Sequence, residues 1–133
     1  MDKSKLLASL AIVTVTSFAC VSAFAQITTI AGCKPENYVQ GEATNRIATQ
    51  GSSYTPKCLR IKVGSTVIIQ ASQHHPLIAM PDINNIKNPF AASDRFTESQ
   101  SRVMNTIGVF GYFCQAHGDA EGDGMAGAII VEQ

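Results

Sequence analysis

The chain has 133 residues, of which 45% are hydrophobic and 15% charged, and its formal net charge at pH 7 is zero. This length fits one small domain. The sequence has no basic stripe of the kind that nucleic-acid binding requires. It also has no block of like charges that would indicate a disordered tail.

The first 25 residues differ from the rest of the chain. Lys3 and Lys5 precede the apolar run 6–15, and Ala23 and Ala25 stand at the small-residue positions of a cleavage site. This pattern predicts a secretory signal peptide over residues 1–25, followed by a mature domain over residues 26–133. The mature protein is then expected in the periplasm or outside the cell.

Two other interpretations of this leader are weaker. A membrane anchor is disfavoured because the apolar run is shorter than the roughly 20 residues that span a bilayer. A lipid anchor at Cys20 is disfavoured because the bulky Phe18 stands where a small residue is wanted. We therefore expect no membrane span after cleavage.

Export would leave three cysteines, namely Cys33, Cys58 and Cys114. In an oxidising compartment an odd number of cysteines means that one thiol has another role. Cys33 and Cys58 both lie outside the part of the chain that carries the histidines and Met125, so we expect them to form a disulfide. Cys114 is then free, and a free thiolate in such a compartment survives best when a metal ion binds it.

The first half of the mature chain predicts several short strands. Residues 27–30 are β-branched, residues 59–63 alternate apolar and basic side chains, and residues 66–71 are apolar enough for a core strand. Between them, residues 36–55 form a loop-rich insert with one or two short strands, at 38–39 and 46–49. Short strands joined by Gly-containing turns favour an antiparallel sandwich.

The second half contributes three more strands, at residues 102–107, 109–114 and 125–131. Residues 82–101 are rich in Asn, Ser, Asp and Pro and predict a short helix or turn over one end of the sandwich. Met80 and Met104 are expected in the core. The predicted fold class is an all-β, Greek-key β-sandwich of seven or eight strands.

Candidate metal ligands gather near the C-terminus. Cys114 and His117 end a predicted strand, a glycine-rich acidic loop follows, and Met125 begins the next strand. A second imidazole must come from His74 or His75, and only one of them can point to the site because adjacent side chains in a strand face opposite ways. Two His, one Cys and a weak Met are the ligand set of an electron-transfer copper centre.

These motifs resemble those of the cupredoxins, the blue-copper proteins of the plastocyanin and azurin type. The similar pieces are the aromatic-Phe-Cys-x-x-His run at 111–117, the Gly-Met pair at 124–125, and a histidine after a core strand. The resemblance covers residues 58–133. It implies one copper ion that cycles between Cu(I) and Cu(II), held by His75, Cys114 and His117 with Met125 as the axial ligand.

The resemblance also implies which histidine binds and where electrons enter. His75 is preferred to His74 because a small residue and then an aliphatic one follow it, as the family's ligand requires. His117 would be the histidine near the surface, within an apolar patch, where electrons enter and leave.

The sequence departs from the family pattern at two points. Seven residues separate His117 from Met125, where the family usually has about four, and a longer loop can draw Met125 away from the metal or leave the site more open. Pro76 has no backbone N–H, whereas many relatives use this position to donate to the cysteine sulfur. We therefore expect a lower reduction potential than in a relative with that donor.

The function implied is one-electron transfer between redox partner proteins by a monomer that is not an enzyme. A copper carrier or storage protein is the alternative, because of the long loop after His117. A multicopper oxidase needs more than the three histidines present. A calcium loop at 119–124 lacks its final Glu, and a Cys-His protease lacks an orienting group.

Overall fold

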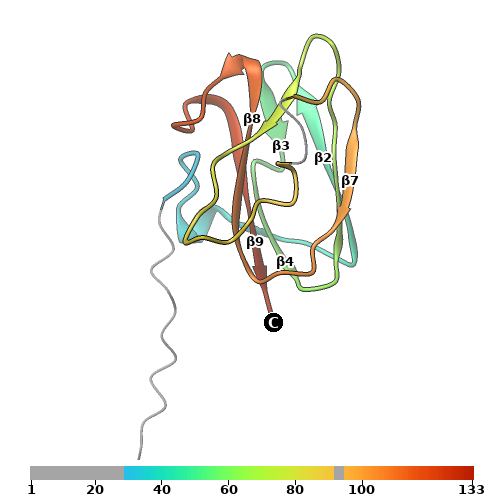
Figure 1. The fold of residues 1–133 in the computed structure, drawn as a ribbon, viewed down its shortest axis with the longest axis vertical. Coiled ribbons are helices and arrows are strands. Elements are labelled where there is room, and N and C mark those ends of the chain that lie inside the picture. Colours follow the sequence, from blue (N-terminus) through green and yellow to red (C-terminus); the bar gives the residue numbers. More distant parts are fainter. Residues whose placement is uncertain (1–28, 92–94) are drawn as a thin grey trace, which may run out of the picture.

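A computed structural model describes residues 29–91 and 95–133, which form two β-sheets packed face to face (Figure 1). The predicted signal peptide and residues 27–28 of the first predicted strand lie outside the described residues. Of that strand, Ile30 makes only an isolated bridge with Cys33. No helix in residues 29–91 and 95–133 has the length and apolar character to cross a membrane.

The first sheet has the strand order β1-β4-β9-β8-β6. Its strands are β1 (Val39–Gln40), β4 (Cys58–Lys62), β9 (Gly124–Glu132), β8 (Gly108–Gly118) and β6 (Leu77–Ala79). The second sheet has the order β3-β2-β5-β7. It contains β3 (Ser53–Thr55), β2 (Thr44–Gln50), β5 (Thr66–Ile69) and β7 (Gln100–Val103), and the 3-10 turn η1 (Pro35–Asn37) precedes β1.

The prediction of an all-β sandwich is confirmed, but the prediction that its strands are antiparallel is wrong for three pairs. Strands β1 and β4, β4 and β9, and β2 and β5 pair in parallel. The cause is that successive strands such as β4 and β5 enter different sheets, so the strands of these three pairs come from segments that are not consecutive in the chain. Local turn residues carry no information about such pairings.

The predicted helix or turn at residues 82–101 is a set of turns in the part of this segment that the structure describes. Ile83 and Ile86 bridge across a tight turn in which Asn84 and Asn85 both have positive φ angles, 53° and 61°. Asn tolerates this left-handed conformation better than most residues. The side chain of Asn88 then fixes the segment by donating to the carbonyls of Met80 and Gly111.

The main core lies between the sheets and follows strict alternation along the strands. From β8 the side chains of Phe110, Tyr112 and Cys114 enter it. The β9 residues that join them are Met125, Ile129 and Val131, and the second sheet adds Ile47, Tyr54, Val67 and Ile69. Met104 belongs to this core, as predicted.

A second apolar cluster covers the outer face of β8 and β9. Phe113 packs there with Ala31, Met80 and Ala126, so Met80 is buried as predicted, although outside the main core. Consecutive residues Phe113 and Cys114 therefore anchor β8 on both of its faces.

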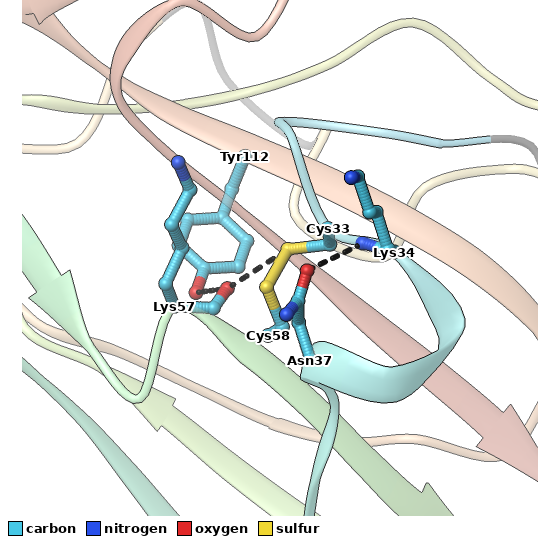
Figure 2. Close-up of a disulfide and its surroundings, with 6 residues drawn as sticks. All are labelled: Cys33, Lys34, Asn37, Lys57, Cys58 and Tyr112. Atoms are coloured by element: carbon cyan, nitrogen blue, oxygen red, sulfur yellow. Dashed lines mark hydrogen bonds between the residues drawn. A yellow bond between two sulfur atoms is a disulfide. The ribbon is translucent and has the colours of Figure 1, made fainter.

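The N-terminal segment is held in place by a disulfide between Cys33 and Cys58, the pair expected from the sequence (Figure 2). The carbonyl oxygen of Lys57 lies 3.8 Å from the sulfur of Cys33 and accepts a hydrogen bond from the hydroxyl of Tyr112 at 3.3 Å. The cross-link thus ties the segment before η1 to the beginning of β4 and to β8.

Two tyrosines pack against each other inside the sandwich. The rings of Tyr54 and Tyr112 meet edge to face with their centroids 4.9 Å apart, and the Tyr54 hydroxyl has no hydrogen-bond partner among the described residues. Burial raises the pKa of Tyr112 well above its ordinary value, with neighbouring Tyr54 adding to the effect. Burial also raises the pKa of Tyr54, with electrostatic repulsion from Cys114 as a second, smaller cause.

Removing the disulfide is expected to lower the free energy of unfolding by about 3 kcal/mol, because the cross-link closes a loop between residues 25 apart. The measurement is urea unfolding of the Cys33→Ala/Cys58→Ala variant against the oxidised protein. The reduced wild-type protein is the control, because it keeps both buried side chains and lacks only the bond. Equal unfolding midpoints for oxidised and reduced protein would contradict this expectation.

The buried tyrosines predict a loss of stability at high pH. Because their pKa values are raised in the folded state, only the unfolded chain releases these protons just above pH 10, and unfolding becomes easier as the pH rises. Each tyrosine should cost about 1 kcal/mol per pH unit in this range. Urea unfolding at pH 8 to 11 measures the slope, which should be shallower in Tyr112→Phe; an unchanged slope in that variant would refute the assignment.

Candidate metal centre

Three side chains with metal-binding atoms converge at one end of the sandwich. His75, Cys114 and His117 place one ligand atom each within 4.8 Å of one another. The Sγ of Cys114 lies 3.8 Å from Nδ1 of His75 and 3.6 Å from Nδ1 of His117. The two imidazole rings lie 5.0 Å apart between centroids, tilted by 41°. All three residues were predicted as ligands from the sequence.

His75 reaches the site because β6 pairs with β8. Leu77 stands directly opposite Cys114 in the antiparallel ladder, so its side chain and that of Cys114 share one face. His75 is two residues before Leu77 and returns to that face, whereas the exposed His74 does not join the cluster.

A tight turn fixes the backbone of His75. Its N–H donates to both the carbonyl and the hydroxyl oxygen of Ser72, at 3.2 Å and 3.1 Å, and Ser72 N–H donates back to the His75 carbonyl. The carbonyl of the next residue, Pro76, accepts from Gln115 N–H at 3.0 Å. The segment that carries His75 is therefore bonded both to itself and to the residue after Cys114.

Strand β8 carries the other two ligands and is longer than predicted. The sequence indicated that it ends at Cys114, but it continues to Gly118, which pairs with Gly124 after an irregularity beyond Phe113. Gly124 has a φ of +67°, and a Cβ there would collide with the carbonyl oxygen of His117. The hairpin thus needs glycine at this position, and it projects His117 towards Cys114 from an exposed arm.

Met125 lies fully buried in the same core cluster as Cys114. The register pairs Phe113 with Ala126, and these two side chains pack together in the outer cluster. Side chains alternate between the two faces along a strand. Met125, one residue before Ala126, therefore points to the inner face, as Cys114 does.

The spacing of the three ligand atoms fits a bound metal ion. A first-row ion bonds to thiolate at about 2.3 Å and to imidazole nitrogen at about 2.0–2.1 Å. With angles between tetrahedral and trigonal, such bonds place sulfur and nitrogen about 3.5–3.8 Å apart, as found here. A thiolate with two imidazoles is a donor set that suits zinc or copper.

Burial differs sharply among the three ligands. Cys114 is fully buried, His75 is half-buried and His117 is exposed. Within the described residues, the two imidazoles are the only polar partners near the sulfur of Cys114, and no backbone N–H donates to it. The site is thus closed on the sulfur side and open at His117.

Sequence reasoning missed two residues that hold the site. Ser72 lies three residues before His75, a spacing typical of a side-chain turn, and this signal was available. Phe96 exchanges two backbone hydrogen bonds with Leu77, at 2.8 Å and 2.9 Å. It lies in a segment without a strand pattern, so nothing in the sequence pointed to this contact.

No protein-family model and no curated protein sequence matches this chain. Solved structures do match it. A Cu-containing nitrite reductase (NirK) from Thermus scotoductus SA-01 aligns with a TM-score of 0.55 and 20% identity, over 74% of this chain and 28% of its own. A pseudoazurin from Sinorhizobium meliltoi aligns with a TM-score of 0.52 and 20% identity, over 71% of this chain and 76% of its own.

At such identities the likeness concerns the fold and leaves the function open. This chain spans little more than a quarter of the nitrite reductase, so that enzyme shares with it only one sandwich-sized region. The two-sheet sandwich, its mixed strand order and these neighbours agree with one another. The protein has the cupredoxin fold.

Proposed function

We propose that this protein is a copper protein that carries single electrons between partner proteins. The observation that carries the proposal is the convergence of His75, Cys114 and His117, at distances that suit one metal ion. Met125 is the proposed axial ligand, supported by its burial beside Cys114. Copper bound by this donor set would exchange one electron by cycling between Cu(I) and Cu(II).

The residues around the site suit this role because they hold the ligands in one arrangement. Cys114 is paired with Leu77 across the ladder, and His75 is fixed by the Ser72 turn. Ligands on rigid elements move little when the charge of the site changes. The exposed His117 offers the partner a short route to the site, whereas the buried sulfur is shielded from water.

We further propose that the chain is exported to the periplasm or beyond, after cleavage of residues 1–25, and acts there as a monomer. The disulfide between Cys33 and Cys58 supports an oxidising compartment. Cys114 is the one free cysteine in the described residues, as the metal-ligand role requires. Redox proteins are the proposed partners. The proposed role involves no binding of nucleic acid and no conversion of a substrate.

A copper carrier or storage protein is the second candidate. The observation that favours it is the exposure of His117 near the end of β8, next to the seven residues that separate it from Met125. An exposed ligand on such an arm can dissociate first and release the ion. Ready transfer of Cu(I) to a chelator would favour this function, and a reversible redox couple with fast electron exchange would favour electron transfer.

Loading with Cu(II) is expected to produce an intense absorption band near ~600 nm, from charge transfer between thiolate and copper. Cys114→Ser should abolish the band, and His74→Ala should leave it unchanged because His74 lies outside the cluster. A weak, tetragonal-type spectrum in the wild-type protein would contradict the proposed site and move the carrier function ahead.

Met125 is tested separately by Met125→Leu, which keeps the buried volume but removes the thioether. We expect a changed band intensity and a higher reduction potential, because a weak donor to Cu(II) is lost. Met104→Leu is the matched control, since Met104 is buried in the same cluster but lies on the connection after β7. If both variants keep the spectrum and the reduction potential of the wild-type protein, Met125 is not a ligand.

Pro76→Asn tests the expected lack of a donor to the sulfur. The new N–H can donate to the thiolate, lower its electron density and so favour Cu(I); a tenfold preference would raise the reduction potential by about 60 mV. The potential is measured by voltammetry of the copper-loaded protein. A potential that stays the same or falls would contradict the expectation that the missing donor at Pro76 lowers the potential.

A further inference from the structure

An arginine on the edge strand of the second sheet packs against Phe96, the residue that pairs with Leu77 beside the metal centre. Arg102 lies on β7, the edge strand of the second sheet, and pairs with the fully buried Val67. Residues paired in this way point to the same face, so the side chain of Arg102 is directed towards the core. A positive charge directed inwards needs partners.

Those partners are two aromatic rings and three oxygen atoms. The guanidinium carbon lies 5.7 Å from the ring centroids of both Phe90 and Phe96, within the range of a cation–π contact. Its nitrogens donate to the carbonyl of Pro89 at 3.1 Å, to the carbonyl of Ser101 and to the side chain of Gln100. We call Arg102 with Phe90 and Phe96 the arginine clamp.

The clamp connects to the metal centre through backbone hydrogen bonds. Phe96 exchanges two of them with Leu77, and Leu77 stands opposite Cys114 on its other side. Strand β6 has only three residues and lies at the edge of its sheet. A segment that pairs with such an edge strand protects it from fraying. Here Phe96 pairs with Leu77, which lies two residues after His75.

We propose that Arg102 is a positioning residue for the metal centre: it holds Phe96 against Leu77 and so fixes His75 relative to Cys114. Among the described residues, Arg102 makes its hydrogen bonds and ring contacts with Pro89, Ser101, Gln100, Phe90 and Phe96, and with none of the three ligands. Its effect must therefore pass through Phe96 and the β6 backbone. This inference extends the proposed copper site, but its first test needs no metal.

A guanidinium is suited to this task for two reasons. Its flat faces can stack on both rings while its edge donates several hydrogen bonds in fixed directions. Lysine offers a point charge without this fork, and methionine offers similar bulk without charge. Arg102→Lys and Arg102→Met therefore remove the clamp in two steps.

The matched control is Arg60. It also lies 5.7 Å from an aromatic ring, that of Tyr38, and forms an ion pair with Glu132 at 3.0 Å. It stands on β4, two strands away from β8, and has no contact with β6 in the described structure. Arg60→Met thus removes a comparable set of contacts away from the proposed path.

The first experiment measures amide hydrogen exchange in the metal-free protein. In Arg102→Met the amides of Leu77 and Phe96 should exchange about tenfold faster or more, because their mutual hydrogen bonds open locally. The amide of Ala128, bonded to the Lys57 carbonyl, should be unchanged and reports global stability. In Arg102→Lys the exchange rates of Leu77 and Phe96 should lie between those of wild type and those of Arg102→Met. In Arg60→Met these two rates should equal those of wild type. Unchanged exchange at Leu77 and Phe96 in Arg102→Met would overturn the inference.

The second experiment uses the copper-loaded protein and separates this inference from the proposed function. Arg102→Met should shift the charge-transfer band and release copper to a chelator several-fold faster, about tenfold if His75 is freed, whereas Arg60→Met should do neither. If wild type shows the band and Arg102→Met shows the same band at the same position, the positioning role is overturned while the proposed copper site stands. If wild type shows no such band, the proposed function fails, and the exchange data alone decide whether the clamp holds β6.

Discussion

The metal centre depends on the backbone at Leu77, which has a neighbouring segment on both sides. On one side it stands opposite Cys114 of β8, and on the other it exchanges two backbone hydrogen bonds with Phe96. Strand β6 has too few residues to hold a ligand rigidly by itself. The segments on its two sides hold β6 in place, and His75 lies two residues before the strand begins. The two ligands that are 39 residues apart in the chain meet because of this pairing.

Strand β8 provides the complementary half of the arrangement. Its alternation sends Tyr112 and Cys114 into the main core and Phe113 into the cluster on the outer face. A strand anchored on both faces cannot rotate about its axis without breaking one cluster. The direction of the Cys114 sulfur is thus set by packing over the length of β8, and the disulfide holds the N-terminal segment that completes the outer cluster.

The sequence predicted that His75, Cys114 and His117 lie together, and the structure places their ligand atoms within 4.8 Å of one another. Cys114 and His117 are only three residues apart, strand alternation allows only one of the two adjacent histidines, and the resemblance to the cupredoxins favoured His75. The parallel pairing of β4 with β9 was missed because it joins segments about 70 residues apart through side-chain packing that no local pattern encodes. The extension of β8 past Cys114 was missed for a similar reason, since its partner Gly124 lies beyond an irregular loop. The bond between Phe96 and Leu77 likewise follows from the folded arrangement alone.

The contact between Gly122 and Ala31 bears on how this protein could diversify. Gly122 is buried, and a Cβ on it would press against the Ala31 backbone, close to the disulfide. The loop between His117 and Met125 is therefore fastened at two glycines, Gly122 and Gly124, while Asp119, Ala120 and Glu121 remain exposed. Insertions at 119–121 would alter the surface that meets other molecules and leave the ligands where they are. Shortening the loop to fewer residues would first have to release the N-terminal segment, so the length of this loop and the start of the chain are expected to evolve together.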